Sequence, residues 1–376
     1  MRTLCIVLLL AACAPISGTP PAVTRPKATQ PVVEPTAVPS RPTTAAEAAP
    51  VQSAQPLTPD RPPTPASGAV EREGASEARL RATLMALHDF HTRHSASATD
   101  DPQTGIGAAR EWLAAQFQSI SPRLKVERDE FVFSFGARPV RAQNIIATLP
   151  GLAEPPQIII ISAHYDSRTV NISDNRSAAP GANDDGSGVA AVLELARLLS
   201  SEKLEATVMF VLFAGEEEGL FGSAHLAPLM RKQGVDIVAM LNNDIIGNVT
   251  GADGARVDDR VRVFSGDPDG GSSRQLAYEA KRIIEGELRG LTVDVVPALD
   301  RPGRGGDHIP FYYAGFPAIR FTEAVENLDH QHSANDRVEF MDMAYLAKVV
   351  RANLAVAFEL GRAAHQTKGD CSNECK

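Results

Sequence analysis

Three features are missing from this sequence, and each absence excludes a class of protein. The apolar run near the start, residues 4–10, is too short to cross a bilayer as a helix, which takes about 20 residues. Lysine and arginine number 37 against 46 aspartates and glutamates, so the net charge of −9 argues against a sequence-independent nucleic-acid binder. No repeat of 20–50 residues is visible, which excludes a repeat array.

The first thirteen residues have the pattern of an export signal. Arg2 precedes the apolar run, which ends in Leu10-Ala11-Ala12-Cys13 and resembles the lipobox of bacterial lipoproteins. The resemblance implies a lipid on Cys13 that anchors an exported protein to the bacterial cell envelope. Ala14 follows the cysteine, which favours the outer membrane. The alternative is an ordinary signal with a chance cysteine.

The segments on either side of the expected folded domain are unlike it in composition. Residues 14–75 are rich in Pro, Ala and Thr and contain almost no large apolar side chains, so they cannot offset the entropy of ordering. They predict an extended tether, with a proline-rich recognition motif as the alternative. The tail at 367–376 carries Cys371 and Cys375. Export permits a disulfide there, and free thiols or a metal site are the other options.

Helices and strands are expected to alternate between residues 76 and 366. Apolar runs such as 157–162 predict strands buried on both faces, as in a parallel sheet. The expected fold is therefore α/β, a three-layer sandwich with a mostly parallel central sheet, and ligands should bind beyond the carboxyl ends of its strands. The expected helices are 76–94, 107–120, 188–199, 219–231, 274–288 and 343–360, and the expected strands are 125–135, 143–149, 157–162, 206–213, 237–241, 260–264, 293–296 and 317–321.

Acidic and histidine side chains follow three of the predicted buried strands. A single strand-end acid has a plain structural explanation, and Asp184 or Asp185 could simply cap the helix that follows them. Several carboxylates brought together by parallel neighbours would repel one another, and a bound dication removes that conflict. Mixed histidine and carboxylate ligands suit zinc. The strand-end residues are His164 and Asp166, Glu216 to Glu218, and Asp244.

These motifs resemble those of the co-catalytic double-zinc exopeptidases, which include bacterial leucyl-type aminopeptidases and relatives of glutamate carboxypeptidase. They are HYD at 164–166, GANDDGSG at 181–188, AGEEEGLFGS at 214–223, NND at 242–244 and HSAND at 332–336, and the resemblance extends from about residue 80 to residue 360. It implies two zinc ions per chain. The implied ligands are His164 and Asp244 for one ion, Glu217 and His332 for the other, and Asp184 between them.

The resemblance also implies a reaction. Asp166 would orient the ring of His164, and Glu216 would be the general base that takes a proton from a water activated by the two metals. No serine or cysteine nucleophile motif is evident. Peptide ends are the expected substrates, and aminopeptidase activity is favoured because no inserted domain is evident. The alternatives are a carboxypeptidase, a glutaminyl cyclase with one zinc, and a non-catalytic surface module.

Some positions within the motifs are ambiguous. Alignment of the segment after residue 218 selects Glu216 and Glu217, which leaves Glu218 as an acid at the start of a helix. His332 is preferred to His330 because it precedes the Ser-x-x-Asp pattern. No tyrosine precedes His332, and Tyr312 and Tyr313 are expected to pack in the core. Residues 305–311 resemble a segment that lines the family's substrate pocket, with a turn and a helix start as the alternative.

Overall fold

The computed structural model describes residues 74–266 and 270–363, so the expected signal with Cys13, most of the tether and the tail with Cys371 and Cys375 lie outside it. Its helices are α1 (Glu77–His88), α2 (Gly105–Ile120), α3 (Gly186–Leu199), α4 (Phe221–Lys232), α5 (Ser272–Glu287), α6 (His308–Tyr313), η1 (Val338–Phe340) and α7 (Met343–Ala363). Its strands are β1 (Lys125–Phe135), β2 (Arg138–Leu149), β3 (Gln157–His164), β4 (Thr207–Phe213), β5 (Asp236–Asn243), β6 (Arg260–Phe264), β7 (Thr292–Val296) and β8 (Ala318–Glu323).

These strands form one sheet, in the order β1-β2-β4-β3-β5-β8-β6-β7. The central strands β4, β3, β5 and β8 all run parallel to their neighbours within that group. Antiparallel pairs join β1 to β2, β2 to β4 and β6 to β8, on either side of this centre. The mostly parallel central sheet is therefore confirmed, and the carboxyl ends of its four central strands lie along one edge.

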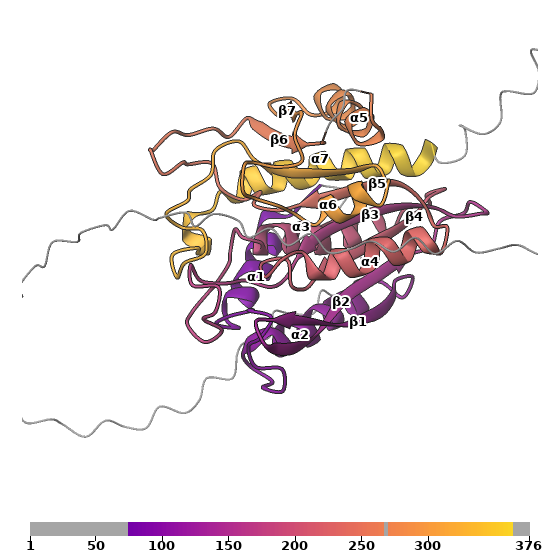
Figure 1. Ribbon diagram of the computed structural model, residues 1–376. Helices are drawn as coiled ribbons and strands as arrows, with labels where there is room; N and C mark the ends of the chain where they lie inside the picture. The colour runs from indigo at the N-terminus through magenta and orange to yellow at the C-terminus, as the bar shows by residue number, and fades with distance from the viewer. Residues whose placement is uncertain (1–73, 267–269, 364–376) are drawn as a thin grey trace, which may run out of the picture. The chain divides into compact units, whose positions relative to one another are not determined.

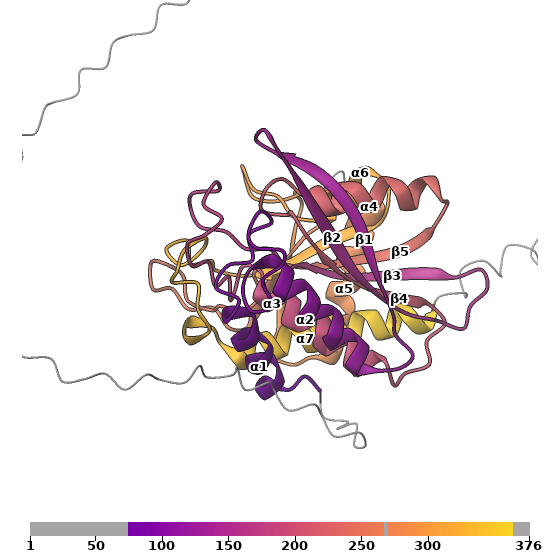
Figure 2. The same cartoon turned by 90° about the horizontal axis from the view of Figure 1, so that it is seen from below.

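Helices cover both faces of the sheet, so the expected three layers are present. Helices α1, α2, α3, α5 and α7 pack together on one face, and α4 and α6 pack on the other (Figures 1 and 2). Strand β3 shows why: Ile159 and Ile161 belong to the larger apolar core and Ile160 to the smaller one, and none is exposed. A strand buried on both faces gives the continuous apolar run that predicted it.

The start of α3 brings the helix close to the end of a central strand. Asp185 is its N-cap, and the carboxylate accepts a hydrogen bond of 2.9 Å from the amide of Gly188. A Cβ atom at Gly188 would lie 2.3 Å from the carbonyl oxygen of Asn243, so only glycine permits this approach. The capping role considered for this pair of aspartates thus belongs to Asp185, which leaves the side chain of Asp184 available for another role.

The observed helices differ from the expected ones by up to three residues at their ends, except that the first is shorter by six residues at its carboxyl end. The first ends at His88 instead of continuing to residue 94, and the chain turns at His91, which has a positive φ of 66°. The fourth begins at Phe221, two residues later than expected. Among the described residues, no helix is long and apolar enough to span a membrane.

Candidate active site

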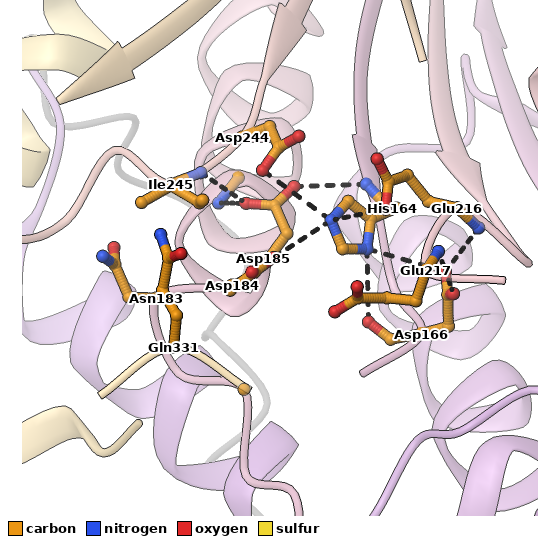
Figure 3. A network of polar contacts seen from close by, with 12 residues as sticks. His164, Asp166, Asn183, Asp184, Asp185, Glu216, Glu217, Asp244, Ile245 and Gln331 are labelled. Carbon is orange, nitrogen blue, oxygen red and sulfur yellow. Dashed lines mark hydrogen bonds and ion pairs between the residues drawn. The ribbon is translucent and has the colours of Figure 1, made fainter. Parts of the chain in front are cut away.

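The five sequence-predicted ligands lie in the connections that follow β3, β4, β5 and β8, or at the ends of these strands, and they meet at one edge of the sheet. His164 is the last residue of β3, and Asp244 follows the last residue of the neighbouring strand β5. Glu217 lies in the loop after β4, and Asp184 lies in the loop that leads into α3. His332 lies in the loop between β8 and η1. Figure 3 shows the ring of His164 among the surrounding carboxylates.

Two groups of side chains have the composition of metal sites. His164, Glu216 and Asp244 form one, which we call the His164 cluster, and Asp184, Glu217 and His332 form the other, the His332 cluster. Within each cluster the potential ligand atoms lie within 4.8 Å of one another. Zinc binds nitrogen and oxygen ligands at about 2.0–2.2 Å, so two ligand atoms of one ion can lie up to about twice that distance apart. The separations within each cluster are of that size.

Asp184 contacts the histidines of both clusters. Its Oδ1 lies 3.3 Å from Nε2 of His164, and its Oδ2 lies 3.0 Å from Nε2 of His332. One oxygen therefore faces each cluster, as a carboxylate that bridges two metal ions would require. The backbone amides of Asn183 and Asp184 donate to the two carboxylate oxygens of Asp336, at 2.8 and 2.9 Å, and this holds the bridging residue in place.

Buried atoms without hydrogen bonds show that the site fits metal ions. Nε2 of His164 and Oε1 of Glu217 are both buried and form no hydrogen bond with the described residues. Each is a good zinc ligand, and leaving such an atom unsatisfied is costly unless something binds it. The two atoms belong to different clusters, so each cluster has one orphaned ligand atom of its own.

The histidine protonation pattern supports the same conclusion. Burial alone would lower the pKa of His164, but the carboxylates of Glu216, Asp166 and Asp184 raise it well above its ordinary value. Burial likewise opposes the change at His332, where Asp184 and Glu217 raise the pKa to about 9. In the absence of metal, the carboxylates of each cluster thus stabilise the protonated, positively charged form of its histidine. A dication would supply the same compensation more strongly.

Asp166 connects the ends of β3 and β4 beneath the His164 cluster. Its carboxylate accepts the backbone amides of Glu216 and Glu217, at 3.3 and 3.1 Å. Its Oδ1 lies 3.6 Å from Nδ1 of His164, and its backbone carbonyl oxygen is closer to that nitrogen, at 3.2 Å. The residue is fully buried and can fix both the imidazole ring and the loop that carries the two glutamates.

Adjacent glutamates point to different partners. Oε2 of Glu217 lies 3.1 Å from Nε2 of His332 and accepts a hydrogen bond of 2.8 Å from Nε of Arg168. Oε2 of Glu216 lies 3.9 Å from Nε2 of His164. Burial, together with the carboxylates of Asp244 and Glu217, raises the pKa of Glu216 well above its usual value. Glu216 is thus the less tightly held of the two and lines the cavity beside the clusters.

Two expectations about neighbouring residues are wrong. Glu218 does not start a helix, since α4 begins at Phe221. Its side chain is buried with Oε1 3.4 Å from Nδ1 of His94, and burial raises its pKa to about 8. Tyr313 is 72% exposed and does not pack in the core, whereas Tyr312 is partly buried against the smaller core. Of the two candidate histidines, the preferred His332 lies in a cluster, whereas the ring of His330 is tilted against that of Phe340, with centroids 4.3 Å apart, and takes no part in either cluster.

The segment at 305–311 combines both of its expected roles. Gly305 lines the cavity, and the segment then enters α6. Behind the cavity, Asp307 is fully buried and accepts a hydrogen bond of 2.5 Å from Oγ of Ser223. Only the start of the segment therefore faces the site.

Sequence reasoning missed the arginines of the site. Arg168 follows the HYD motif by two positions and holds Glu217. Arg320, in β8, is 1% exposed and places Nη2 3.1 Å from Oδ2 of Asp244. Asp336 was part of a recognised motif, but its contact with the Asp184 loop was not expected. The sequence did contain one signal for Arg320, namely an arginine inside a predicted strand. A buried arginine needs a carboxylate partner, and Asp244 is one such partner here.

Comparison with known proteins covers the part of the chain that contains this site. A model of peptidase family M28 matches residues 144–357 of the chain. A probable zinc metalloprotease of Leptosphaeria maculans is 37% identical over 325 residues, which cover 77% of this chain and 75% of that protein. The matched part contains the whole set of predicted ligands.

Solved structures share the fold. An aminopeptidase from Aneurinibacillus sp. strain AM-1 matches with a TM-score of 0.59 at 18% identity, covering 77% of this chain and 94% of that one. A glutaminyl cyclase from Porphyromonas gingivalis matches with a TM-score of 0.58 at 20% identity, covering 76% and 98%. At these identities the likeness concerns the fold alone, and the two activities show that one fold serves both.

Proposed function

The chain belongs to peptidase family M28, and we propose that this zinc metallopeptidase removes single residues from the amino ends of peptides with two zinc ions. The observation that carries the proposal is the pair of clusters joined by Asp184. His164 and Asp244 would hold one ion, Glu217 and His332 the other, and Asp184 would contact both. Two metal-binding groups that share a carboxylate are suited to hydrolysis by an activated water.

Each residue then has a defined part in the reaction. When bound, zinc would polarise the peptide carbonyl and lower the pKa of the attacking water. Glu216 is the member of the His164 cluster that we do not assign as a ligand; it lines the cavity, takes the proton of that water and later delivers it to the leaving amine. Asp166 fixes the loop that carries Glu216 through two backbone amides, and Asp336 fixes Asp184 in the same way.

Turnover and metal content together test the proposal. Purified protein loaded with zinc is assayed on leucine anilide, on its N-acetylated form and on peptides with free or blocked ends, with and without a chelator. We expect two tightly bound zinc ions by elemental analysis, cleavage of the free amino form, and loss of cleavage with the chelator. A single tight zinc with cyclisation of amino-terminal glutamine would instead identify a glutaminyl cyclase, and equal cleavage of the acetylated form would exclude an aminopeptidase.

We also propose that the enzyme is exported and held at the cell envelope by lipid on Cys13. The proposal depends on the sequence of residues 1–13, which lie outside the described residues. A Cys13→Ala variant should move from the membrane fraction to the soluble fraction. The anchor assignment is wrong if that variant still sediments fully with the membrane.

A further inference from the structure

One part of the active-site cavity is unusually rich in arginine. The cavity has a volume of about 270 Å³ and lies beside the two clusters. Its lining includes Arg301 and Arg304, from the loop between β7 and α6, and Arg320, from β8. We call these three residues the arginine wall. They come from segments close together in sequence, and Arg320 contacts Asp244, whereas a fourth arginine of the lining, Arg168, contacts Glu217 of the His332 cluster.

Three carboxylates, Asp300, Glu326 and Asp244, pair with Arg301 and Arg320 of the arginine wall. Asp300 pairs with both Arg301 and Arg320, and Glu326 pairs with Arg301. Glu326 also pairs with a further arginine, Arg262, so its charge is shared again. Asp244, the remaining partner of Arg320, is a predicted zinc ligand, and a bound ion would take up most of its charge. Arg304 is therefore the member of the wall that none of these three carboxylates neutralises.

Two of the arginines keep donors that the protein does not use. Nε of Arg320 is buried and forms no hydrogen bond with the described residues. Arg304 is exposed, and its hydrogen bond, 3.0 Å from Nη2, goes to Oε1 of Gln331, which is neutral. It forms no ion pair with the described carboxylates. If Arg320 served only the stability of the fold, its buried Nε would be satisfied, because an unpaired buried donor is costly.

We propose that the arginine wall binds a carboxylate of the substrate. A guanidinium group offers paired donors that match the geometry of a carboxylate, and an anion would both use the free donors and balance the charge of Arg304. The enzyme would then favour peptides whose cleaved end carries a negative charge. This inference depends on the proposed function, since it names the class of substrate for the same site.

The carboxylate could belong to an acidic side chain of the peptide or to its carboxyl end, and two pairs of matched substrates distinguish these sources. Glutamate anilide and glutamine anilide have nearly the same shape and differ in the charge of the side chain. A dipeptide with a free carboxyl end and the same dipeptide with a carboxyl-terminal amide differ in the charge of the α-carboxylate. For each pair, kcat/KM and the affinity by calorimetry are measured with the zinc-loaded full chain.

We expect the charged member of one pair to be preferred by at least about 10-fold, the value of a hydrogen bond to a charged group. In an Arg304→Gln variant the preference should fall by about 10-fold, and in Arg304→Lys by less. Arg282→Gln is the matched control, because Arg282 is exposed on α5 and pairs with Glu279 away from the cavity. That control should keep the full preference. High salt should weaken the preference, since an exposed charge is screened.

Equal kcat/KM and equal affinity within both pairs would overturn the inference, and so would a preference that survives Arg304→Gln unchanged. Turnover of the neutral members shows separately whether the proposed function holds. If no member of either pair is cleaved, the peptidase proposal falls, and the affinities alone decide the inference. Tighter binding of a charged member that depends on Arg304 supports it, and equal binding contradicts it.

Discussion

The two clusters share Asp184 but depend on different parts of the fold. The histidine of the His164 cluster ends β3, a central strand, and its side chain is 1% exposed. The histidine of the His332 cluster lies in a long loop with a positive φ of 55°, and its side chain is 11% exposed. A strand end inside a parallel sheet is fixed by its neighbours, whereas a loop must be held by specific contacts. We therefore expect the His332 cluster to lose its metal first.

Removal of the shared residue should abolish this difference and have the largest effect. Asp184→Ala takes one ligand oxygen from each cluster, so neither zinc should remain tightly bound. The rate should fall by more than the ~10⁴-fold that loss of a general base can cause. Elemental analysis and the rate on a neutral anilide check this, and one tightly retained zinc would show that Asp184 does not bridge.

Substitution of each glutamate by glutamine should separate a role in proton transfer from a role in zinc binding. Glu216→Gln keeps the shape of the side chain and should leave both zinc ions bound while the rate falls by roughly 10²–10⁴-fold. Glu217→Gln removes a charged ligand from the His332 cluster and should release one zinc. Zinc content and kcat are measured for both variants. Near-normal turnover of Glu216→Gln with two zinc ions bound would remove Glu216 from the mechanism.

Weakening of the contact between Asp336 and the loop that carries Asp184 should test whether the two clusters differ in zinc affinity. Asp336 accepts the amides of Asn183 and Asp184, and its own backbone carbonyl accepts the amide of Ala182. Asp336→Asn places an NH₂ group opposite one of these amides, and we expect the weaker zinc to bind about 10- to 100-fold less tightly. The control is Asp258→Asn, at an exposed residue that pairs with Arg256.

Titration with a competing chelator measures both zinc affinities of these variants. The affinity of the tighter zinc should change less than that of the weaker one in Asp336→Asn. An equal loss at both sites would show that the two clusters do not differ in the way their positions indicate.

The same difference explains what sequence could and could not predict. The ligands at the ends of β3 and β5 follow continuous apolar runs, and the order of parallel strands brings them together, so the fold was predictable from this pattern. Glu218 was misplaced because three consecutive acids do not reveal where the chain turns from loop to helix. The arginine wall was missed because its members belong to a loop and a late strand whose neighbours are set by tertiary packing alone.

The smallest predicted effect concerns the buried carboxylate of Asp307, the residue that precedes α6. Burial raises the pKa of Asp307 to about 7, and also that of Asp336 to about 7. Two backbone amides hold Asp336, whereas Asp307 has one hydroxyl donor, Ser223, and its Oδ2 has no partner. A carboxyl group with a raised pKa keeps its proton in the folded protein when the unfolded chain has lost it. Stability therefore falls as the pH rises from the unfolded value near 4 through about 7.

Asp307→Asn removes this titration while it retains an oxygen for the hydroxyl of Ser223. In zinc-free protein, the free energy of unfolding of the variant relative to the natural chain should rise by roughly 1–3 kcal/mol between pH 5 and pH 8, because each unit of pKa shift is worth about 1.4 kcal/mol. Urea unfolding at several pH values measures the difference. If the two stability curves run parallel over this range, the carboxyl group of Asp307 is already ionised in the folded protein at pH 5. Its surroundings would then stabilise the buried charge.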